Sequence, residues 1–330
     1  MSYNSPLNNT ITQVKGLAIL LVVFGHIASP LGPAIFSFHI PLFFFLGGMF
    51  IKTEYFPIEF LKRNFVRLII PFFIFGALGL LVNDLKNILL HRPLEDFIQS
   101  IIGLLFWMDE PHLQHYGFVL WFLPALFWAR MLSYCLLKYL KLNELIIFML
   151  CVLCAYLFAN NSSFTLPFGL DKGMVAVPWV FMGSVFFRNK EKLLTLPIWE
   201  IVSMALLITL IVYFGDMPRL DMATKNIGHI AVTLPYTFSV IILIVYLTYN
   251  INFGECTPLK KISAVISKFG SQSMLVYVIH PYTNNAASLV SAYFLGEGYW
   301  YVKFALTATM LMLVIRVKLN HQDSPLFKYL

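Results

Sequence analysis

The feature that most constrains this chain is a succession of long apolar runs separated by short polar connections. About 20 apolar residues form a helix long enough to cross a bilayer, and lipid admits only helices and closed barrels. The pattern therefore predicts an all-α integral membrane protein with a bundle of about ten transmembrane helices. The predicted segments are residues 16–29, 34–51, 66–83, 117–140, 143–159, 172–187, 198–214, 229–249, 271–294 and 299–316.

The composition excludes the main classes of soluble protein. Hydrophobic residues make up 59% of the 330 residues and charged residues only 12%, against about 45–50% and 25% in an average soluble domain. This leaves too little polar surface for a secreted globule, and too much apolar sequence for a disordered chain. We expect residues 1–330 to form one membrane-embedded domain, with the short run 97–107 as an interfacial helix.

The distribution of Lys and Arg predicts the topology. If the N-terminus is cytoplasmic, sixteen of the 23 basic residues fall on the cytoplasmic side and six on the other, with Arg130 inside a span. Cytoplasmic connections of membrane proteins carry such an excess of Lys and Arg, so both termini are predicted to be cytoplasmic. The net charge of +7 does not indicate nucleic-acid binding, because the cations are scattered between apolar runs.

Ionisable residues inside the predicted spans are candidates for function, because charge is costly in lipid. His26 follows Lys15 by 11 residues, which is almost three helical turns. Both side chains therefore project from nearly the same helix face, about 16 Å apart. The pattern predicts a cation at the inner boundary and an imidazole near the middle of the membrane. An imidazole suits general-base catalysis near neutral pH, although a buried neutral histidine bonded to a carbonyl is the ordinary alternative.

A second group of candidates surrounds the second and third predicted spans. His39 lies near the outer end of the second span, and Arg63 and Arg67 lie at the entrance of the third. The two arginines are about one helical turn apart, so they can face the same ligand. Paired arginines suit the phosphates of an anionic cofactor, whereas topological positive charge is the simpler alternative.

The last candidates lie in the fourth and ninth spans. Arg130 needs a partner or a wet cavity, because the predicted span cores contain no Asp or Glu, and Trp121 opens the same span. Ser273, Tyr277 and His280 recur at i, i+4 and i+7 and share one helix face. No metal site is predicted, since the Cys-x-x-Cys pair at 151–154 lies in an apolar run without the turn that zinc needs.

Five of these sequence pieces, in chain order, resemble the membrane-bound acyltransferase family 3. Within it they are most similar to the branch of fucose 4-O-acetylases and of O-antigen and exopolysaccharide O-acetyltransferases. The pieces cover the chain nearly end to end. They are Val14–Ile19 with Val22–His26, His39–Gly48, Arg63 with Arg67, Leu120–Pro124, and Phe269–His280.

The resemblance implies a ten-helix enzyme of the bacterial inner membrane. It would transfer an acetyl group from cytosolic acetyl-CoA to a hydroxyl of a carbohydrate acceptor, a lipid-linked or polymeric glycan. It implies that Lys15 and His26 act in catalysis and that Arg63 and Arg67, with Lys15, bind the donor. The sequence departs from the family in having Lys15 where Arg is common and in its wider arginine spacing. We also expect no C-terminal SGNH hydrolase-like domain of the kind that larger O-antigen acetylases carry.

A mechanism follows, with alternatives left open. His26 would deprotonate the acceptor hydroxyl, or would carry the acetyl group as a covalent intermediate. The residues expected to bind the acceptor are His39, Trp121, Arg130, Ser273, Tyr277 and His280. A transporter or flippase of a small anion or lipid-linked sugar is the main alternative, but inverted repeats and intramembrane carboxylates are not evident in the sequence. A non-catalytic polysaccharide-assembly or receptor protein is the third.

Overall fold

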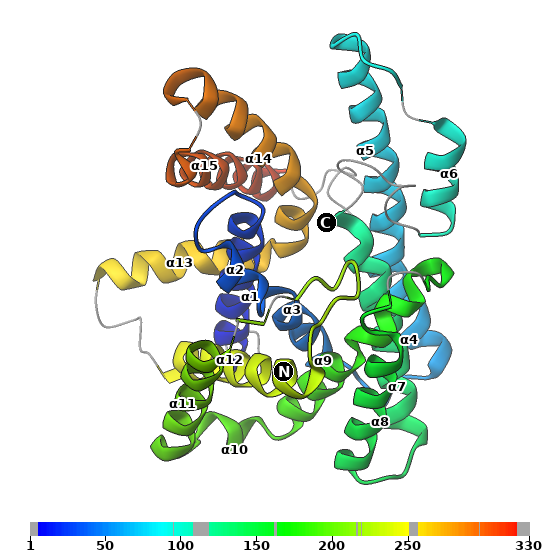
Figure 1. Ribbon diagram of the computed structural model, residues 1–330, viewed down its shortest axis with the longest axis vertical. Helices are drawn as coiled ribbons and strands as arrows, with labels where there is room; N and C mark the ends of the chain where they lie inside the picture. The colour runs from blue at the N-terminus through cyan, green and yellow to red at the C-terminus, as the bar shows by residue number, and fades with distance from the viewer. Residues whose placement is uncertain are drawn as a thin grey trace.

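The chain folds into a helical bundle, and one continuous helix from Pro57 to Leu89, which includes α5, runs along one side of it (Figure 1). The computed structural model describes residues 6–94, 96–107, 119–161, 164–215, 217–218, 220–250, 257–296 and 298–321. Within these ranges the extended pairing is limited to a β-bridge between Asp221 and Asn226. The helices are α1 Pro6–Gly25, α2 Gly32–Phe36, α3 His39–Gly48, α4 Pro57–Asn64, η1 Phe65–Ile69, α5 Ile70–Leu89, α6 Phe97–Leu105, α7 Phe122–Tyr139, α8 Glu144–Phe158, η3 Pro167–Gly169, α9 Leu170–Arg188, α10 Lys190–Leu194, α11 Ile198–Phe214, α12 Ile230–Asn250, α13 Thr257–Ser271, α14 Ser273–Leu295 and α15 Trp300–Asn320.

The described residues include five helices long and apolar enough to cross a membrane. A sixth span would be formed by α13 and α14, which pass the same test together but meet at 91°. The five are Leu7–Gly25, Pro57–Leu89, Val119–Tyr139, Pro167–Arg188 and Ile230–Asn250. The protein is therefore an all-helical, multi-pass membrane protein. Both termini are predicted to be cytoplasmic. The two ends of the chain lie outside the described residues.

The first helix differs from its prediction. A span over 16–29 was expected, but α1 runs from Pro6 to Gly25. Lys15 therefore lies midway along α1, not at its inner boundary. His26 follows the last helical residue, with its N–H donated to the Val22 carbonyl at 3.2 Å. The start of the first helix was predicted too late in the chain, because polar residues that precede the apolar run are accommodated within the bundle. Gln13, for example, donates to the Ser263 hydroxyl of α13 at 2.6 Å.

The second and third predicted spans also have unexpected boundaries. The segment 34–51 forms two helices, α2 and α3, which meet at Ser37 and Phe38. The segment 66–83 is the centre of one continuous helix from Pro57 to Leu89, with the π-helical turn η1 inside it. Pro71 lies two residues after the end of this turn. Because proline has no backbone N–H to donate to the preceding turn, it disturbs the regular α-helical pattern at this point.

Helix α9 forms the centre of the bundle, where it packs against α7, α3 and α8. Its crossing with α3 needs glycine on both sides. A Cβ added to Gly48 would lie 1.8 Å from the Val180 carbonyl oxygen, and one added to Gly183 would lie 1.9 Å from the Phe45 carbonyl oxygen. The two backbones are thus in direct contact. This is the role of small residues in close membrane-helix packing.

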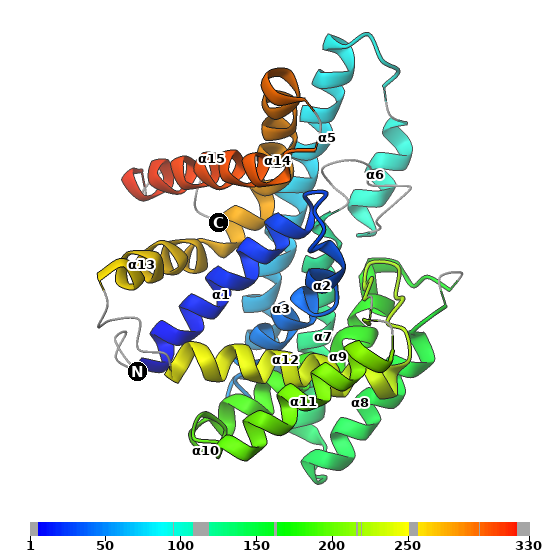
Figure 2. The ribbon, with the colours of Figure 1, turned by 60° about the vertical axis from the view of Figure 1, so that its left-hand side comes forward.

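Helix α1 is held on several sides, by α13, α12, α14 and α3 (Figure 2). Its contact with α13 is as close as the α3–α9 crossing, since a Cβ on Gly16 would lie 2.0 Å from the Ile266 carbonyl oxygen. A Cβ on Gly270 would lie 1.8 Å from the Thr12 carbonyl oxygen. The sequence did not predict α13, which lies in a connection between two predicted spans. These contacts fix the position of Lys15 relative to α13.

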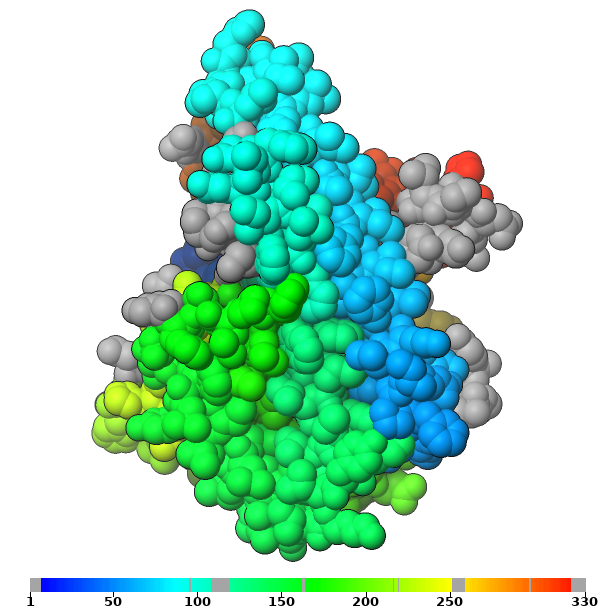
Figure 3. All heavy atoms as spheres, turned by 90° about the vertical axis from the view of Figure 1, so that its right-hand side faces the viewer, coloured from blue at the N-terminus to red at the C-terminus, as the bar shows by residue number. Residues whose placement is uncertain are grey.

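The helix predicted over 97–107 is present as α6, Phe97–Leu105. Asp96 caps it, and its carboxylate accepts the backbone N–H groups of Ile98 at 2.9 Å and Gln99 at 3.1 Å. Figure 3 shows that α6 and the second half of α5 project beyond the helical body. Phe97 and Ile98 are largely exposed, as expected for a helix that contacts lipid.

Candidate active site

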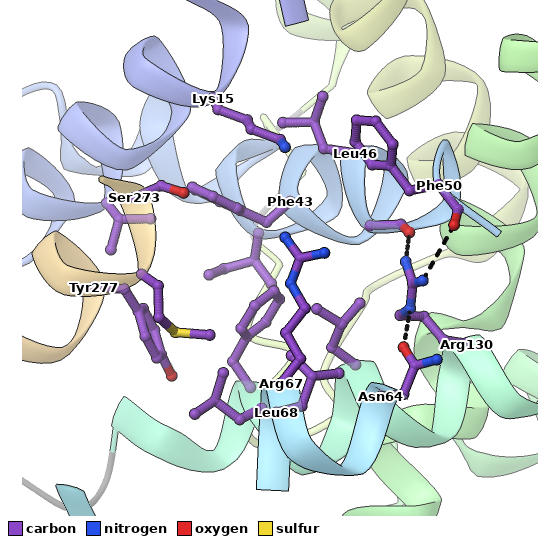
Figure 4. A pocket seen from close by; sticks show the side chains of 17 residues that line it. Lys15, Phe43, Leu46, Phe50, Asn64, Arg67, Leu68, Arg130, Ser273 and Tyr277 are labelled. Carbon is purple, nitrogen blue, oxygen red and sulfur yellow. Dashed lines mark hydrogen bonds between the residues drawn. The ribbon is translucent and has the colours of Figure 1, made fainter. Parts of the chain in front are cut away.

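Three cations from three separate helices converge on one central cavity (Figure 4). Lys15 comes from α1, Arg67 from the π-helical turn η1 and Arg130 from α7. The cavity has a volume of about 150 Å³, and Ser273 and Tyr277 of α14 lie on its opposite side. The rest of its lining is Asn64, Gly47 and a set of apolar residues: Val22, Ile40, Phe43, Leu46, Phe50, Leu68, Phe122, Leu123, Leu126 and Met274.

Arg130 is held by neutral acceptors, as its place in an apolar span requires. Its Nε donates to the side-chain oxygen of Asn64 at 2.6 Å. One terminal nitrogen donates to the Gly47 carbonyl and the other to the Phe50 carbonyl at 3.4 Å. Gly47 and Phe50 lie at and just beyond the C-terminal end of α3, where unpaired carbonyls favour a cation. Asn64 in turn donates to the Phe60 carbonyl at 2.7 Å, which fixes the orientation of its amide.

Within the described part of the chain, the positive charge at this cavity is not neutralised by an acidic side chain. Among the described residues, no carboxylate forms an ion pair with Lys15, Arg67 or Arg130. The Lys15 amine lies 4.4 Å from the centroid of the Phe50 ring, a cation–π contact. Like charges gathered in a partly buried site repel one another unless a counterion is present. The cavity is therefore suited to a ligand with several negative charges.

A wider cavity of about 630 Å³ adjoins the central cavity, and we call it the cationic mouth. The two share Lys15, Phe50, Asn64, Arg67 and Arg130. The cationic mouth is also lined by Lys52, Tyr55, Phe60, Lys62, Arg63 and Val66. Together they form a path from a positively charged opening to the centre of the bundle.

The two predicted arginines occupy different parts of this path. Arg67 lines both cavities, whereas Arg63 lines only the cationic mouth. Arg63 forms an exposed ion pair with Glu59 at 2.9 Å and lies 4.6 Å from the centroid of the Tyr55 ring. An exposed ion pair of this kind contributes little free energy, so Arg63 can exchange Glu59 for another anion. The π-helical turn that carries Arg67 is a distortion often found at functional sites.

The three predicted histidines gather beyond the C-terminal end of α1. The rings of His26 and His280 have centroids 5.2 Å apart. A Cβ on Gly25, the residue before His26, would lie 4.0 Å from the Nε2 atom of His39. His39 and His280 are buried, whereas His26 is exposed.

Hydrogen bonds to backbone carbonyls fix the protonation pattern of two of these rings. Nδ1 of His39 lies 2.7 Å from the Ile35 carbonyl oxygen, and Nδ1 of His280 lies 2.7 Å from that of Tyr277. A carbonyl oxygen only accepts, so each Nδ1 carries a hydrogen and each neutral ring keeps a lone pair on Nε2. Nε2 of His280 is buried and has no hydrogen-bond partner among the described residues. These nitrogens can accept hydrogen bonds from hydroxyl groups.

The cluster formed by His26, His39 and His280 does not line the central cavity. It lies only about one helical turn away from it. Val22 and Tyr277 line the cavity, and they precede His26 and His280 by about one turn of α1 and α14, or about 5 Å of rise. The Tyr277 ring lies between, 6.2 Å from the His280 centroid, and its hydroxyl donates to the Val119 carbonyl. Ser273, Tyr277 and His280 thus form one stripe that reaches from the cavity to the cluster.

Trp121 does not line the central cavity. Its ring packs 6.5 Å from Phe44 and 6.3 Å from Phe122. Sequence reasoning missed Asn64, the side-chain acceptor for Arg130, and Phe50, which contacts Lys15. An asparagine between two arginines at the start of a span was a usable signal for Asn64. The carbonyls that bind Arg130 leave no signal in the sequence.

The fold is that of a multi-pass membrane protein. The path lined by cations is suited to an anionic ligand inside its helical bundle. The model of acyltransferase family 3, described as an acyltransferase domain, matches residues 8–317. The chain therefore belongs to this family, and membership implies acyl transfer to a carbohydrate at a membrane. No curated protein and no solved structure matches the chain.

Proposed function

We propose that this protein is an O-acetyltransferase that moves an acetyl group from cytosolic acetyl-CoA to a hydroxyl of a surface-glycan sugar. Family membership supports acyl transfer. The observation that carries the choice of donor is the convergence of Lys15, Arg67 and Arg130 on one cavity without a neutralising carboxylate among the described residues. Coenzyme A carries several phosphate charges on a nucleotide and its thioester at the end of a long, thin arm, which matches a cationic opening and a narrow interior.

The donor would enter through the cationic mouth. Arg63 and Lys52, which line the cationic mouth but not the central cavity, would contact the nucleotide phosphates. Arg67 and Lys15, which line both cavities, would hold the diphosphate where the arm begins. Arginine binds phosphate through two parallel hydrogen bonds, and lysine binds it as a point charge. The arm would then follow α1 past Val22 towards His26.

The chemistry we propose needs a base, and His26 is the candidate. Its imidazole removes the proton of the acceptor hydroxyl, and the oxygen attacks the thioester carbonyl carbon. The carbon–sulfur bond breaks, and the coenzyme leaves as a thiolate that takes the proton from the imidazolium. General-base help of this kind is worth about 10²–10⁴ in rate. An acetyl-histidine intermediate is the covalent variant of the same scheme.

The acceptor would bind around the histidine cluster. His39 and His280 each hold a lone pair on Nε2, so they would accept hydrogen bonds from sugar hydroxyls and orient the reacting oxygen towards His26. Ser273 and Tyr277 continue this polar stripe into the central cavity. Trp121 is packed in an aromatic cluster, so we assign it a supporting role. Arg130, held by neutral acceptors at the cavity, would act on the donor side.

The proposal includes a membrane arrangement. We propose about ten membrane-crossing or membrane-embedded helices, both termini in the cytoplasm, and the bacterial inner membrane as location. This arrangement places the cationic mouth on the cytoplasmic side, where acetyl-CoA is available. The acceptor would be a lipid-linked or polymeric glycan, as in the fucose 4-O-acetylase-like branch of the family.

The test uses membranes that contain the full chain and acetyl-CoA with a deuterated acetyl group. Mass spectrometry of the glycan fraction is expected to show one labelled acetyl group per modified sugar, which alkaline hydrolysis removes as an ester. Membranes without the protein serve as the control. Labelled coenzyme consumed without an ester on glycan, or no consumption at all, would refute the proposed function.

A further inference from the structure

A groove between α13 and α15 lies apart from the cavities described above. It has a volume of about 480 Å³. Most of its lining is apolar, and two basic side chains, Lys268 of α13 and Arg316 of α15, complete it. The other lining residues are Val265, Phe269, Ala308, Thr309, Met312, Leu313, Ile315 and Leu319.

The polar side chains of this groove leave it with a positive charge. The Thr309 hydroxyl is already bonded, since it donates to the Ala305 carbonyl at 2.8 Å. Lys268 and Arg316 are exposed, and neither forms an ion pair with a carboxylate among the described residues. None of the described residues that line the groove is acidic. As far as the structure describes the chain, the groove therefore presents two positive charges without an acidic partner beside a mostly apolar surface.

The α13 wall of the groove is held against the rest of the bundle by close contacts. This wall is pinned to α1 by the Gly16–Ile266 and Gly270–Thr12 backbone contacts. The Gln13–Ser263 hydrogen bond, 2.6 Å long, adds a polar tie between the same two helices. A ligand in the groove therefore meets a preformed wall and needs no large rearrangement of the protein.

We infer that this groove binds an anionic phospholipid. The phosphate would lie between Lys268 and Arg316, and one acyl chain would lie along the apolar lining. Basic sites between membrane helices on the cytoplasmic side recognise anionic headgroups in this way. A small soluble anion would leave the apolar lining uncovered, and a neutral lipid would leave both cations without a partner. The assignment does not depend on acyl transfer, since the groove shares no residue with the central cavity.

The experiment measures lipid binding by native mass spectrometry of the full chain. The delipidated protein is offered an equimolar mixture of phosphatidylglycerol and phosphatidylcholine. The wild type is expected to retain phosphatidylglycerol selectively. The double variant Lys268→Gln with Arg316→Gln is expected to lose about tenfold or more in affinity, because each basic residue near an anionic headgroup contributes about 1 kcal/mol, a factor of about five.

Three further variants make the result specific. Lys260→Gln with Lys261→Gln removes the same charge from exposed positions of α13 outside the groove, and should bind like the wild type. Lys268→Arg with Arg316→Lys keeps both charges and should also bind. Ala308→Phe keeps the charges but fills the groove, and should weaken binding. If the glutamine double variant fails to fold, Ala308→Phe and the single variant Arg316→Gln decide the question.

Three outcomes would overturn the inference. Equal retention of the two lipids would show that the cations play no part in binding. Unchanged binding by the Ala308→Phe variant would place the lipid elsewhere on the surface. Complete displacement of phosphatidylglycerol by an equimolar polyprenyl phosphate would identify an isoprenoid carrier as the occupant in place of a phospholipid.

Discussion

His26 and His280 face each other just beyond the end of α1, with ring centroids 5.2 Å apart and ring planes inclined by 32°. His280 is buried and its Nδ1 is committed to the Tyr277 carbonyl, whereas His26 is exposed. The pair thus combines a ring with a fixed protonation pattern and a ring that a ligand can reach. This asymmetry suits a base and a neighbouring group that orients the substrate.

Replacing Arg67 with alanine should weaken donor binding. A lost hydrogen bond to a charged group costs roughly 1.5–3 kcal/mol, so the apparent KM for acetyl-CoA should rise by about tenfold or more. Acetyl-pantetheine, which lacks the nucleotide, should be nearly insensitive to the change. Steady-state kinetics with both donors measure the difference. Lys192→Ala, an exposed cation outside the mouth, is the control. Equal losses with both donors would indicate a packing role for Arg67.

The Arg130–Asn64 hydrogen bond should be strongly coupled. Arg130 connects α7 to the end of α3 and to Asn64, the last residue of α4. A double-mutant cycle of Arg130→Met and Asn64→Ala, read from thermal unfolding in detergent, should give a coupling energy above about 1 kcal/mol. The exposed Arg188–Glu144 ion pair, at 2.9 Å, should show less than about 1 kcal/mol. Additive losses at Arg130 and Asn64 would contradict the assigned network.

Gly48→Ala should destabilise the crossing of α3 and α9. The added Cβ would lie 1.8 Å from the Val180 carbonyl oxygen, and the two backbones would have to separate. Overpacking of this kind costs typically 1–3 kcal/mol or more. Gly32→Ala, whose Cβ would meet nothing within 4 Å, is the matched control and should leave the unfolding temperature unchanged. Similar unfolding temperatures for both variants would disprove the close approach.

The proposed topology can be tested by cysteine labelling in a background without the four native cysteines. Ile58 and Leu94 are both exposed, at 58% each, and the proposal places them on opposite sides of the membrane. A membrane-impermeant maleimide added to intact cells should label Leu94→Cys and not Ile58→Cys. The reverse labelling pattern would refute the orientation predicted from the distribution of Lys and Arg. It would also refute the proposal that acetyl-CoA enters from the cytosol.

The sequence predicted the bounds of several helices and a stripe of polar side chains on one of them. Helix α11 has the predicted bounds, and α8, α12 and α14 differ from theirs by one or two residues, because apolar runs of this length form helices in lipid. The stripe of Ser273, Tyr277 and His280 was also predictable, since i, i+4 and i+7 share one helix face.

The remaining features depend on tertiary contacts that no local pattern encodes. The start of α1 was misjudged because Gln13 is paired with Ser263, which is distant in the sequence. The break between α2 and α3, and the carbonyl acceptors of Arg130, likewise arise from packing. The separation of the Lys15 cavity from the histidine cluster follows from the position of Lys15 midway along α1 and of His26 beyond its end.

The most direct test of the account is the rate of acetyl transfer from acetyl-CoA to glycan by the His26→Gln variant. Glutamine keeps a hydrogen bond but cannot accept the proton, so the rate should fall by roughly 10² or more, the usual worth of a general base. Expression and unfolding temperature should stay near wild type, because the side chain is exposed. His321→Gln, an exposed histidine at the end of α15, should keep full activity. A His26→Gln enzyme that retains more than about half of the wild-type rate would contradict the general-base role, given the size of that effect.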